Sequence, residues 1–216
     1  MSQANVVTNK HHFAHHFASA SHEFETCKLG MWFFLAQELL FFSGVFVMYA
    51  VFRYFYPEMF IEAHHHLSWK LGALNTVLLI TSSFTMVMGV RAAQLRKSRE
   101  CFWHLTATFM FALGFMVVKG IEYSAKIHHG LVPSIWFNAP GVNETLPIFF
   151  GCYFFMTGLH GIHVLVGMGL LFWLMIRAYR NEFSTGYFTP VEMVGLYWHL
   201  VDLIWIFLFP LLYLIG

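Results

Sequence analysis

The sequence predicts an all-α integral membrane protein with five transmembrane helices. Of its 216 residues, 58% are hydrophobic and only 11% are charged, whereas soluble domains carry about 25% charged residues. The mean hydropathy is +0.62. So few charges cannot solvate the surface of a globule of this size, and lipid is therefore expected to surround most of the chain. The net charge of +1 argues against a nucleic-acid-binding protein, which needs a clustered basic face.

Five apolar stretches are each long enough to cross a hydrocarbon core of about 30 Å, which takes roughly 20 helical residues. These predicted spans cover about 29–52, 71–95, 102–124, 146–176 and 193–215. They do not alternate apolar and polar residues as the strands of a membrane barrel do. The fourth span, at about 30 residues, is longer than a bilayer requires, and we expect it to tilt or to extend into the interface.

The chain before the first span is polar and lacks the basic and then apolar pattern of a signal peptide. We expect residues 1–27 to form an N-terminal tail and residues 28–216 to form the five-helix domain. The tail carries five histidines that could chelate a metal: His11, His12, His15, His16 and His22. Because these histidines stand in a polar context, a mobile tail is the preferred interpretation. The three cysteines form no CxxC pair, which argues against a disulfide framework or a thiolate metal site.

Basic residues gather on one side of the predicted membrane, as the positive-inside rule requires of the cytoplasmic side. Eight precede the first span or follow the second and fourth spans: Lys10, Lys28, Arg91, Arg96, Lys97, Arg99, Arg177 and Arg180. The opposite loops hold only Arg53, Lys70 and Lys126. This asymmetry predicts a cytoplasmic N-terminus and, after five crossings, an extracytoplasmic C-terminus.

Ionisable side chains inside a span are costly to bury, and each is therefore a candidate for function. The predicted spans contain Glu38, Lys119, Glu122, His160, His163, His199 and Asp202. The last six form three pairs with i,i+3 spacing, so both members of a pair lie on one helix face. A rise of about 1.5 Å per residue places Lys119 and Glu122 in an outer ion pair. The other five side chains are expected to form an inner polar layer.

The residues alone leave three roles open for the inner layer. Its histidines could hydrogen-bond to the carboxylates and to backbone carbonyls as an interhelical network, which is the preferred interpretation. They could instead handle protons, or ligate a metal or a haem iron, although the carboxylates compete for the same histidines. Glu38 is flanked by Phe and Leu with no cation close in sequence. Burial of this kind favours a neutral carboxyl group, the form that hydrophobic carbodiimides label.

Two long motifs resemble subunit III of the haem–copper oxidases. Residues 155–167 read FMTGLHGIHVLVG and resemble the family's TGxHGxHV signature. Residues 196–205 read LYWHLVDLIW and resemble its YWHFVDxxW signature near the C-terminus. The stretches 74–79 (LNTVLL) and 119–123 (KGIEY) are similar to two shorter family motifs. The chain resembles the short bacterial form, which lacks the first two of the seven spans of the mitochondrial form.

The resemblance implies a non-catalytic subunit of a proton-pumping cytochrome c oxidase in a bacterial cytoplasmic membrane. Haem and copper would lie in partner subunits, with no metal and no cofactor in this chain. The expected partners are subunit I as the main contact, subunit II, small subunits and bound phospholipid, and a respiratory supercomplex is a further candidate. The subunit would support the stability of subunit I and its proton uptake. The alternatives are a quinol oxidase subunit, an accessory subunit of a nitric-oxide reductase, and an autonomous membrane haem protein.

The resemblance also implies roles for individual residues. Glu38 matches the family's buried carbodiimide-reactive glutamate. The histidines and the aspartate of the inner layer become framework residues without a chemical step: His160, His163, His199 and Asp202. Lys28 and Trp32 are candidates for contact with a lipid headgroup, although Lys28 stands where the long form has an arginine. Lys119 replaces a neutral or acidic residue of other family members.

Overall fold

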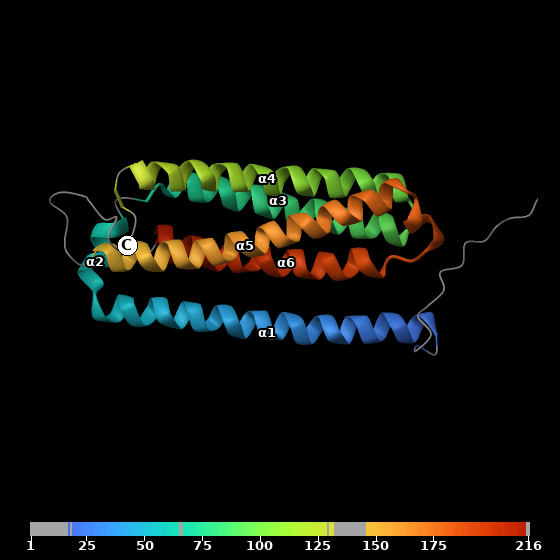
Figure 1. The fold of residues 1–216 in the computed structure, drawn as a ribbon, viewed down its shortest axis with the longest axis horizontal. Coiled ribbons are helices and arrows are strands. Elements are labelled where there is room, and N and C mark those ends of the chain that lie inside the picture. Colours follow the sequence, from blue (N-terminus) through green and yellow to red (C-terminus); the bar gives the residue numbers. More distant parts are fainter. Residues whose placement is uncertain (1–16, 18, 65–66, 129, 132–145, 215–216) are drawn as a thin grey trace, which may run out of the picture.

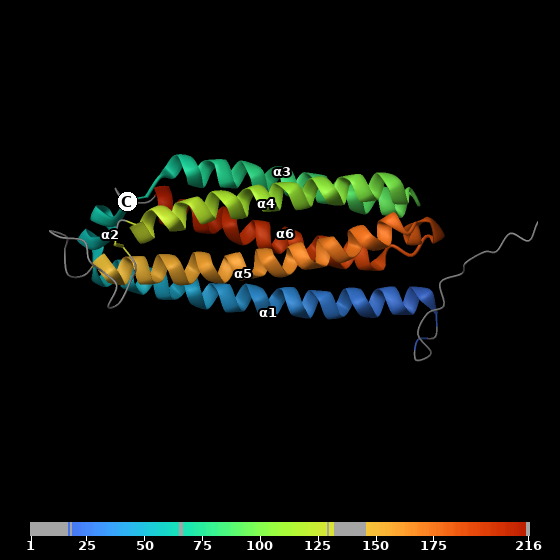
Figure 2. The same ribbon diagram turned by 45° about the horizontal axis from the view of Figure 1, so that its top comes forward.

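The computed structural model describes residues 17, 19–64, 67–128, 130–131 and 146–214. Within these residues, five helices are long and apolar enough to cross a membrane, which confirms the predicted all-α membrane fold. The five helices lie roughly side by side along one axis (Figure 1), and the view turned by 45° in Figure 2 shows the same arrangement.

The five long helices agree with the predicted spans to within a few residues, except at the start of the first. They are α1 (Ala20–Phe55), α3 (Trp69–Gln94), α4 (Ser98–His128), α5 (Leu146–Tyr179) and α6 (Thr189–Phe209). After α6, the chain continues into a π-helical turn, η3 (Pro210–Leu214). The shorter elements α2 (Pro57–His64) and η2 (Glu182–Thr185) lie in two of the connections.

Helix α1 begins well before the predicted span. Ser19 caps it, because the backbone N–H of His22 donates a hydrogen bond to the Ser19 hydroxyl oxygen at 3.1 Å, and such a cap satisfies a donor of the first turn. Residues 20–27, which the sequence placed in the polar tail, are therefore part of the helix. The other four tail histidines lie outside the described residues: His11, His12, His15 and His16.

Helix α2 was not predicted from the sequence, which suggested only a loop there. Pro57 occupies its first position, where the missing N–H costs nothing. Its buried side chains include Phe60, which makes edge-on ring contacts with Tyr49 of α1 and Phe149 of α5 at centroid distances of 5.1 and 5.2 Å. This short helix thus ties the end of α1 to the start of α5.

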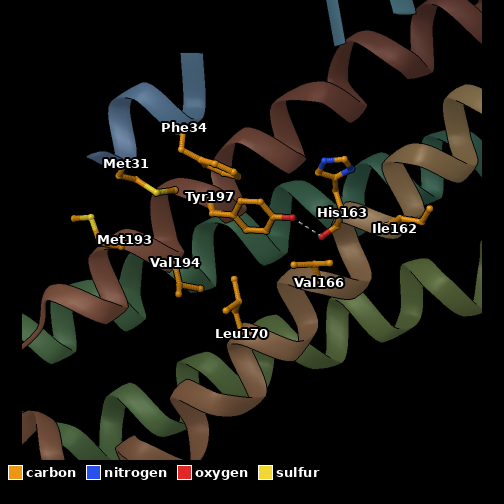
Figure 3. A pocket seen from close by; sticks show the side chains of 9 residues that line it. All are labelled: Met31, Phe34, Ile162, His163, Val166, Leu170, Met193, Val194 and Tyr197. Atoms are coloured by element: carbon orange, nitrogen blue, oxygen red, sulfur yellow. Dashed lines mark hydrogen bonds between the residues drawn. The ribbon is translucent and has the colours of Figure 1, made fainter. Parts of the chain in front are cut away.

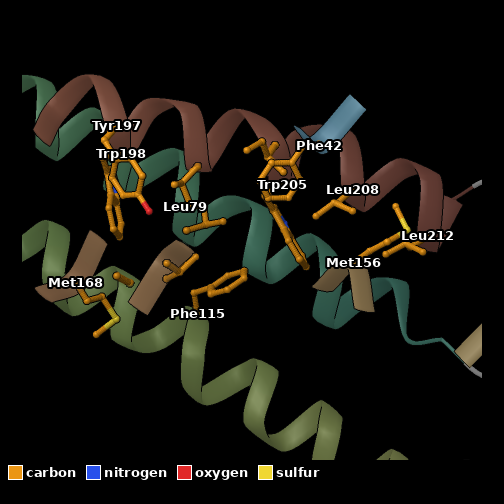
Figure 4. Close-up of a cluster of buried hydrophobic side chains, with 14 of the residues drawn as sticks. Phe42, Leu79, Phe115, Met156, Met168, Tyr197, Trp198, Trp205, Leu208 and Leu212 are labelled. Atoms are coloured by element: carbon orange, nitrogen blue, oxygen red, sulfur yellow. The ribbon is translucent and has the colours of Figure 1, made fainter. Parts of the chain in front are cut away.

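Helices α3, α4, α5 and α6 enclose the core, in which two tryptophans from α6 are fully buried (Figure 4). The indole N–H of Trp198 donates to Ser82 and that of Trp205 donates to Thr76, both at 3.1 Å and both to α3. A Cβ atom on Gly167 would lie 2.6 Å from the Trp198 ring. Glycine is therefore required where α5 crosses this tryptophan.

Helix α1 stands outside this four-helix body and packs mainly on α6. Phe34 and Phe46 of α1 contact Tyr197 and Phe207 of α6 at centroid distances of 6.0 and 6.5 Å. The Tyr49 hydroxyl donates to the carbonyl oxygen of Leu211. These contacts lie at separate positions along α1. Space is therefore left between α1 and the four-helix body.

Candidate functional site

A cleft of about 370 Å³ lies between the first half of α1 and the four-helix body (Figure 3). Its lining comes from α1, α5 and α6 and is almost entirely apolar: Met31, Phe34, Ile162, His163, Val166, Leu170, Met193, Val194 and Tyr197. The Tyr197 hydroxyl donates a hydrogen bond to the backbone carbonyl of His163 at 2.9 Å. The only aromatic hydroxyl of the lining therefore already donates its hydrogen bond within the protein.

His163, which lines this cleft, contacts the carboxyl group of Glu38 on α1. His163 Nε2 lies 3.2 Å from Glu38 Oε2, and both side chains are mostly buried, at 19% and 14% exposed. Edge-on contact with the Phe42 ring at 5.1 Å helps to hold the imidazole. No ionisable residue lies close to Glu38 in the sequence. His163 is distant in the chain and meets Glu38 only because α1 packs on the body.

The hydrogen bonds of His163 indicate which of its two ring nitrogens is the donor. Nδ1 lies 2.8 Å from the carbonyl oxygen of Leu159, and because a carbonyl only accepts, Nδ1 must carry a proton. A neutral imidazole then has an acceptor at Nε2. Glu38 and His163 thus form a contact of 3.2 Å between α1 and α5, in which Nε2 faces the carboxyl group.

The remaining residues of the predicted inner layer do not join this pair. His199 Nδ1 lies 2.7 Å from the Ser83 hydroxyl of α3. The His160 ring is fully buried beside Trp205 and Phe115, at centroid distances of 5.3 and 5.7 Å. Within the described chain, neither ring nitrogen of His160 and neither carboxyl oxygen of Asp202 has a hydrogen-bond partner.

The sequence suggested that the inner histidines hydrogen-bond to the two carboxyl groups and to backbone carbonyls. Among the described residues, His163 does both, whereas His199 contacts a serine and the His160 ring has no hydrogen-bond partner. Residues three apart on a helix differ by about 60° around its axis. In α5, this rotation points His163 towards α1 and His160 into the core. The i,i+3 spacing correctly places two side chains on similar faces, but it does not give them the same neighbours.

The structure pairs Lys119 with Glu122 and adds a second lysine. Lys119 Nζ lies 3.0 Å from Glu122 Oε2, and Lys126 Nζ lies 2.8 Å from Glu122 Oε1. The Tyr213 hydroxyl donates to the same carboxylate at 2.7 Å, and the Tyr153 hydroxyl accepts from both lysines at 3.1 and 3.2 Å. This five-residue group, the Glu122 cluster, joins α4, α5 and η3 near the α2 end of the bundle.

Lys126 was counted among the loop residues in the sequence, yet it is only 4% exposed. Its i,i+4 spacing from Glu122 was the available signal, since residues four apart on a helix are neighbours. The prediction missed it because α4 continues to His128, beyond the end of the apolar stretch.

The two candidates for headgroup contact separate in the structure. Lys28 Nζ lies 3.7 Å from Glu192 Oε1 of α6, one turn before the cleft residue Met31, so it stands at one end of the cleft. Trp32 is 56% exposed and does not line the cleft. Neither Lys28 nor Trp32 is among the residues that line the cleft.

The described residues contain no group of three or more His, Cys, Asp or Glu side chains placed to hold a metal ion. The three histidines of the predicted inner layer have different surroundings: a serine for His199, a carboxyl group for His163 and aromatic rings for His160. They therefore do not act as one ligand set.

Comparison with known proteins gives a consistent result over nearly the whole chain. The family model described as cytochrome c oxidase subunit III matches residues 4–216. The chain is 33% identical over 193 residues to the "Probable cytochrome c oxidase subunit 3" of Nocardia farcinica, covering 87% of each protein. It is 31% identical over 192 residues to cytochrome c oxidase subunit 3 of Thermostichus vulcanus, covering 87% of this chain and 86% of the relative. With the corresponding protein of Corynebacterium diphtheriae, the identity is 30% over 184 residues and 84% of each chain.

Proposed function

The chain belongs to the cytochrome c oxidase subunit III family, and from this membership we propose that it is a non-catalytic subunit that steadies the oxidase and supports its proton uptake. It is a multi-pass membrane protein of an oxidoreductase complex. The proposed main partner is subunit I, which with subunit II would hold the haem and copper. The proposed location is a bacterial cytoplasmic membrane, which fits the bacterial relatives.

Cytochrome c is the proposed electron donor of the complex. The relatives that cover most of this chain are all described as subunits of cytochrome c oxidases. This favours the cytochrome c oxidase over the quinol oxidase and the nitric-oxide reductase. The autonomous haem protein is disfavoured because the histidines of the spans sit in separate surroundings.

The proton-handling part of the proposal depends on Glu38 and His163. Two groups in hydrogen-bond contact can pass a proton between them with little rearrangement, and His163 of this pair lines the cleft rather than the closed core. The pair would take up or buffer a proton beside the partner subunit. It would perform no redox step.

Lipid binding is proposed for the cleft itself. Its apolar walls suit an acyl chain, and Lys28 at its end suits a lipid phosphate, because a cation favours an anionic headgroup. The Lys28–Glu192 contact of 3.7 Å is long for a strong ion pair, so a phosphate could compete for the lysine. A lipid held there would fill the space that the contacts between α1 and α6 leave.

The test is to purify the complex from the native membrane through a tag on this chain. We expect a haem–copper subunit I to copurify, with oxygen consumption driven by reduced cytochrome c and retained phospholipid. The isolated chain should show no haem absorption band. Recovery of nitric-oxide reductase subunits instead, or of a haem that stays with the isolated chain, would refute the proposed function.

A further inference from the structure

A second pocket, of about 350 Å³, lies between the start of α4 and the end of α5. Its lining residues are Arg99, Phe102, Trp103, Ala178, Tyr179 and Asn181. None of them lines the α1 cleft. We call this the α4–α5 pocket, and its chemistry differs from that of the cleft because a guanidinium group stands at its edge.

The floor of the pocket is fixed by the fold. Ala178 is buried, and its carbonyl oxygen accepts a hydrogen bond from the Ser98 hydroxyl at 2.8 Å. This bond joins the first residue of α4 to the last turn of α5. The two helix ends that form the pocket are therefore held together by a buried hydrogen bond.

The walls are aromatic and face outward. Phe102 is half-buried and contacts Trp103 and Tyr179 at ring-centroid distances of 5.6 and 5.9 Å. Trp103 is 62% exposed and Tyr179 is 76% exposed. Tryptophan and tyrosine concentrate where a membrane helix meets the headgroup layer, because one side of the ring is apolar and the other is polar.

Arg99 provides the charge at this edge. It is exposed, and among the described residues it has no acidic partner, whereas its neighbours Lys97 and Glu100 pair with each other at 2.9 Å. The nearby Arg96 packs its guanidinium group against Gly186 instead. A free guanidinium group next to interfacial aromatic rings has the geometry to bind phosphate through two parallel hydrogen bonds.

We propose that the α4–α5 pocket binds the headgroup of an anionic phospholipid. Arg99 would bind the phosphate, and the aromatic walls would enclose the glycerol region. The acyl chains would then follow the outer apolar surface of α4 and α5, where Phe109 and Phe172 pack at 6.5 Å. A pocket of this volume is within the range of small-molecule sites, about 300–1,000 Å³. This lipid would be additional to one in the α1 cleft and independent of it.

The test uses the intact oxidase complex, reconstituted with a phosphatidylglycerol that carries a photoreactive group in its acyl chain. After illumination, mass spectrometry compares labelling of residues 98–110 and 170–181 between the wild type, Arg99→Ala and the control Arg91→Ala. Arg91 lies at the same end of the bundle and is exposed, but it does not line the pocket. We expect Arg99→Ala to lower labelling about tenfold, as loss of a charge-assisted hydrogen bond does. Arg91→Ala should leave it unchanged.

Competition separates a lipid site from a site for phosphate alone. Unlabelled phosphatidylglycerol should abolish the labelling, and inorganic phosphate or glycerol phosphate at the same concentration should not. Equal labelling of Arg99→Ala and the wild type would overturn the proposal, and so would equal competition by inorganic phosphate. Labelling of residues in the α1 cleft should not change in Arg99→Ala. This measurement distinguishes a lipid in the α4–α5 pocket from the lipid proposed for the α1 cleft.

Discussion

At the scale of single residues, the ionisable groups of the spans are distinguished by their partners. Glu38 has a histidine on another helix, and Glu122 has two lysines on its own helix. An isolated carboxyl group in lipid would be neutral. Glu38 is not isolated, because His163 Nε2 lies 3.2 Å from its carboxyl group.

Replacing Glu38 with Gln keeps the size of the side chain but removes the exchangeable proton. We expect Glu38→Gln to assemble normally and to retain initial turnover, because the proposed function assigns no redox step to this chain. Labelling by a hydrophobic carbodiimide should disappear, and sustained proton uptake should fall. Mass spectrometry of the labelled subunit and stopped-flow proton uptake measure these changes.

Glu100→Gln is the matched control for this variant, because Glu100 is exposed and pairs only with Lys97. It should leave both labelling and uptake unchanged. Labelling that persists in Glu38→Gln would show that another carboxyl group is the reactive one.

The Glu122 cluster leads to an asymmetric prediction. Glu122→Gln leaves two buried lysines without an anion, and breaking a buried ion pair in this way costs about 3–5 kcal/mol. Lys126→Met leaves Lys119 and Glu122 as a neutral pair, so its cost should be much smaller. Thermal unfolding of the purified complex, followed by circular dichroism, compares the two variants. Equal destabilisation by both would contradict the view that the carboxylate is the centre of the cluster.

At the scale of elements, glycines determine where helices can approach one another. Five glycines occur in α5, but they are not equivalent. A Cβ atom on Gly167 would meet the Trp198 ring at 2.6 Å, whereas one on Gly169 would have no neighbour within 4 Å. Only the first of these two is required by packing, and the sequence alone gives no means of telling them apart.

The two glycines form a matched pair for mutation. Gly167→Ala should push α6 away from α5 and destabilise the body by about 1–3 kcal/mol, the usual cost of overpacking. Gly169→Ala should be neutral, or stabilising by up to about 1 kcal/mol, because alanine favours the helix. Yield and melting temperature of the purified complex report both effects. A destabilising Gly169→Ala variant would indicate that a partner subunit packs against this position.

At the scale of the whole molecule, the fold gathers the predicted basic loops at one end. The start of α1 and the connections α3–α4 and α5–α6 lie together, opposite α2 (Figure 1). This grouping matches the separation of basic residues in the sequence. The positive-inside rule predicts that this end faces the cytoplasm. The orientation therefore stays a prediction.

Single cysteines introduced in a background without the three native cysteines test this orientation. Ser184→Cys, in η2, should react with a membrane-impermeant maleimide only in inside-out vesicles. Glu58→Cys, in α2, should react only in right-side-out spheroplasts. Both native residues are exposed, so labelling depends on the side rather than on burial. The reverse pattern would invert the assigned topology.

The sequence by itself determined the number of spans, their extent to within a few residues at most ends, and the residues whose burial is expensive. Bilayer thickness and the cost of buried charge fix these features locally. It also carried the motifs of the family.

Only the tertiary structure decided which polar groups meet. It paired Glu38 with His163, left His160 among aromatic rings, added Lys126 to the Glu122 cluster, and opened a cleft beside α1. The physical reason is that lipid and the protein interior are about equally apolar. An apolar helix therefore does not reveal in its sequence which face turns inward, and that rotation about the helix axis determines every contact between helices.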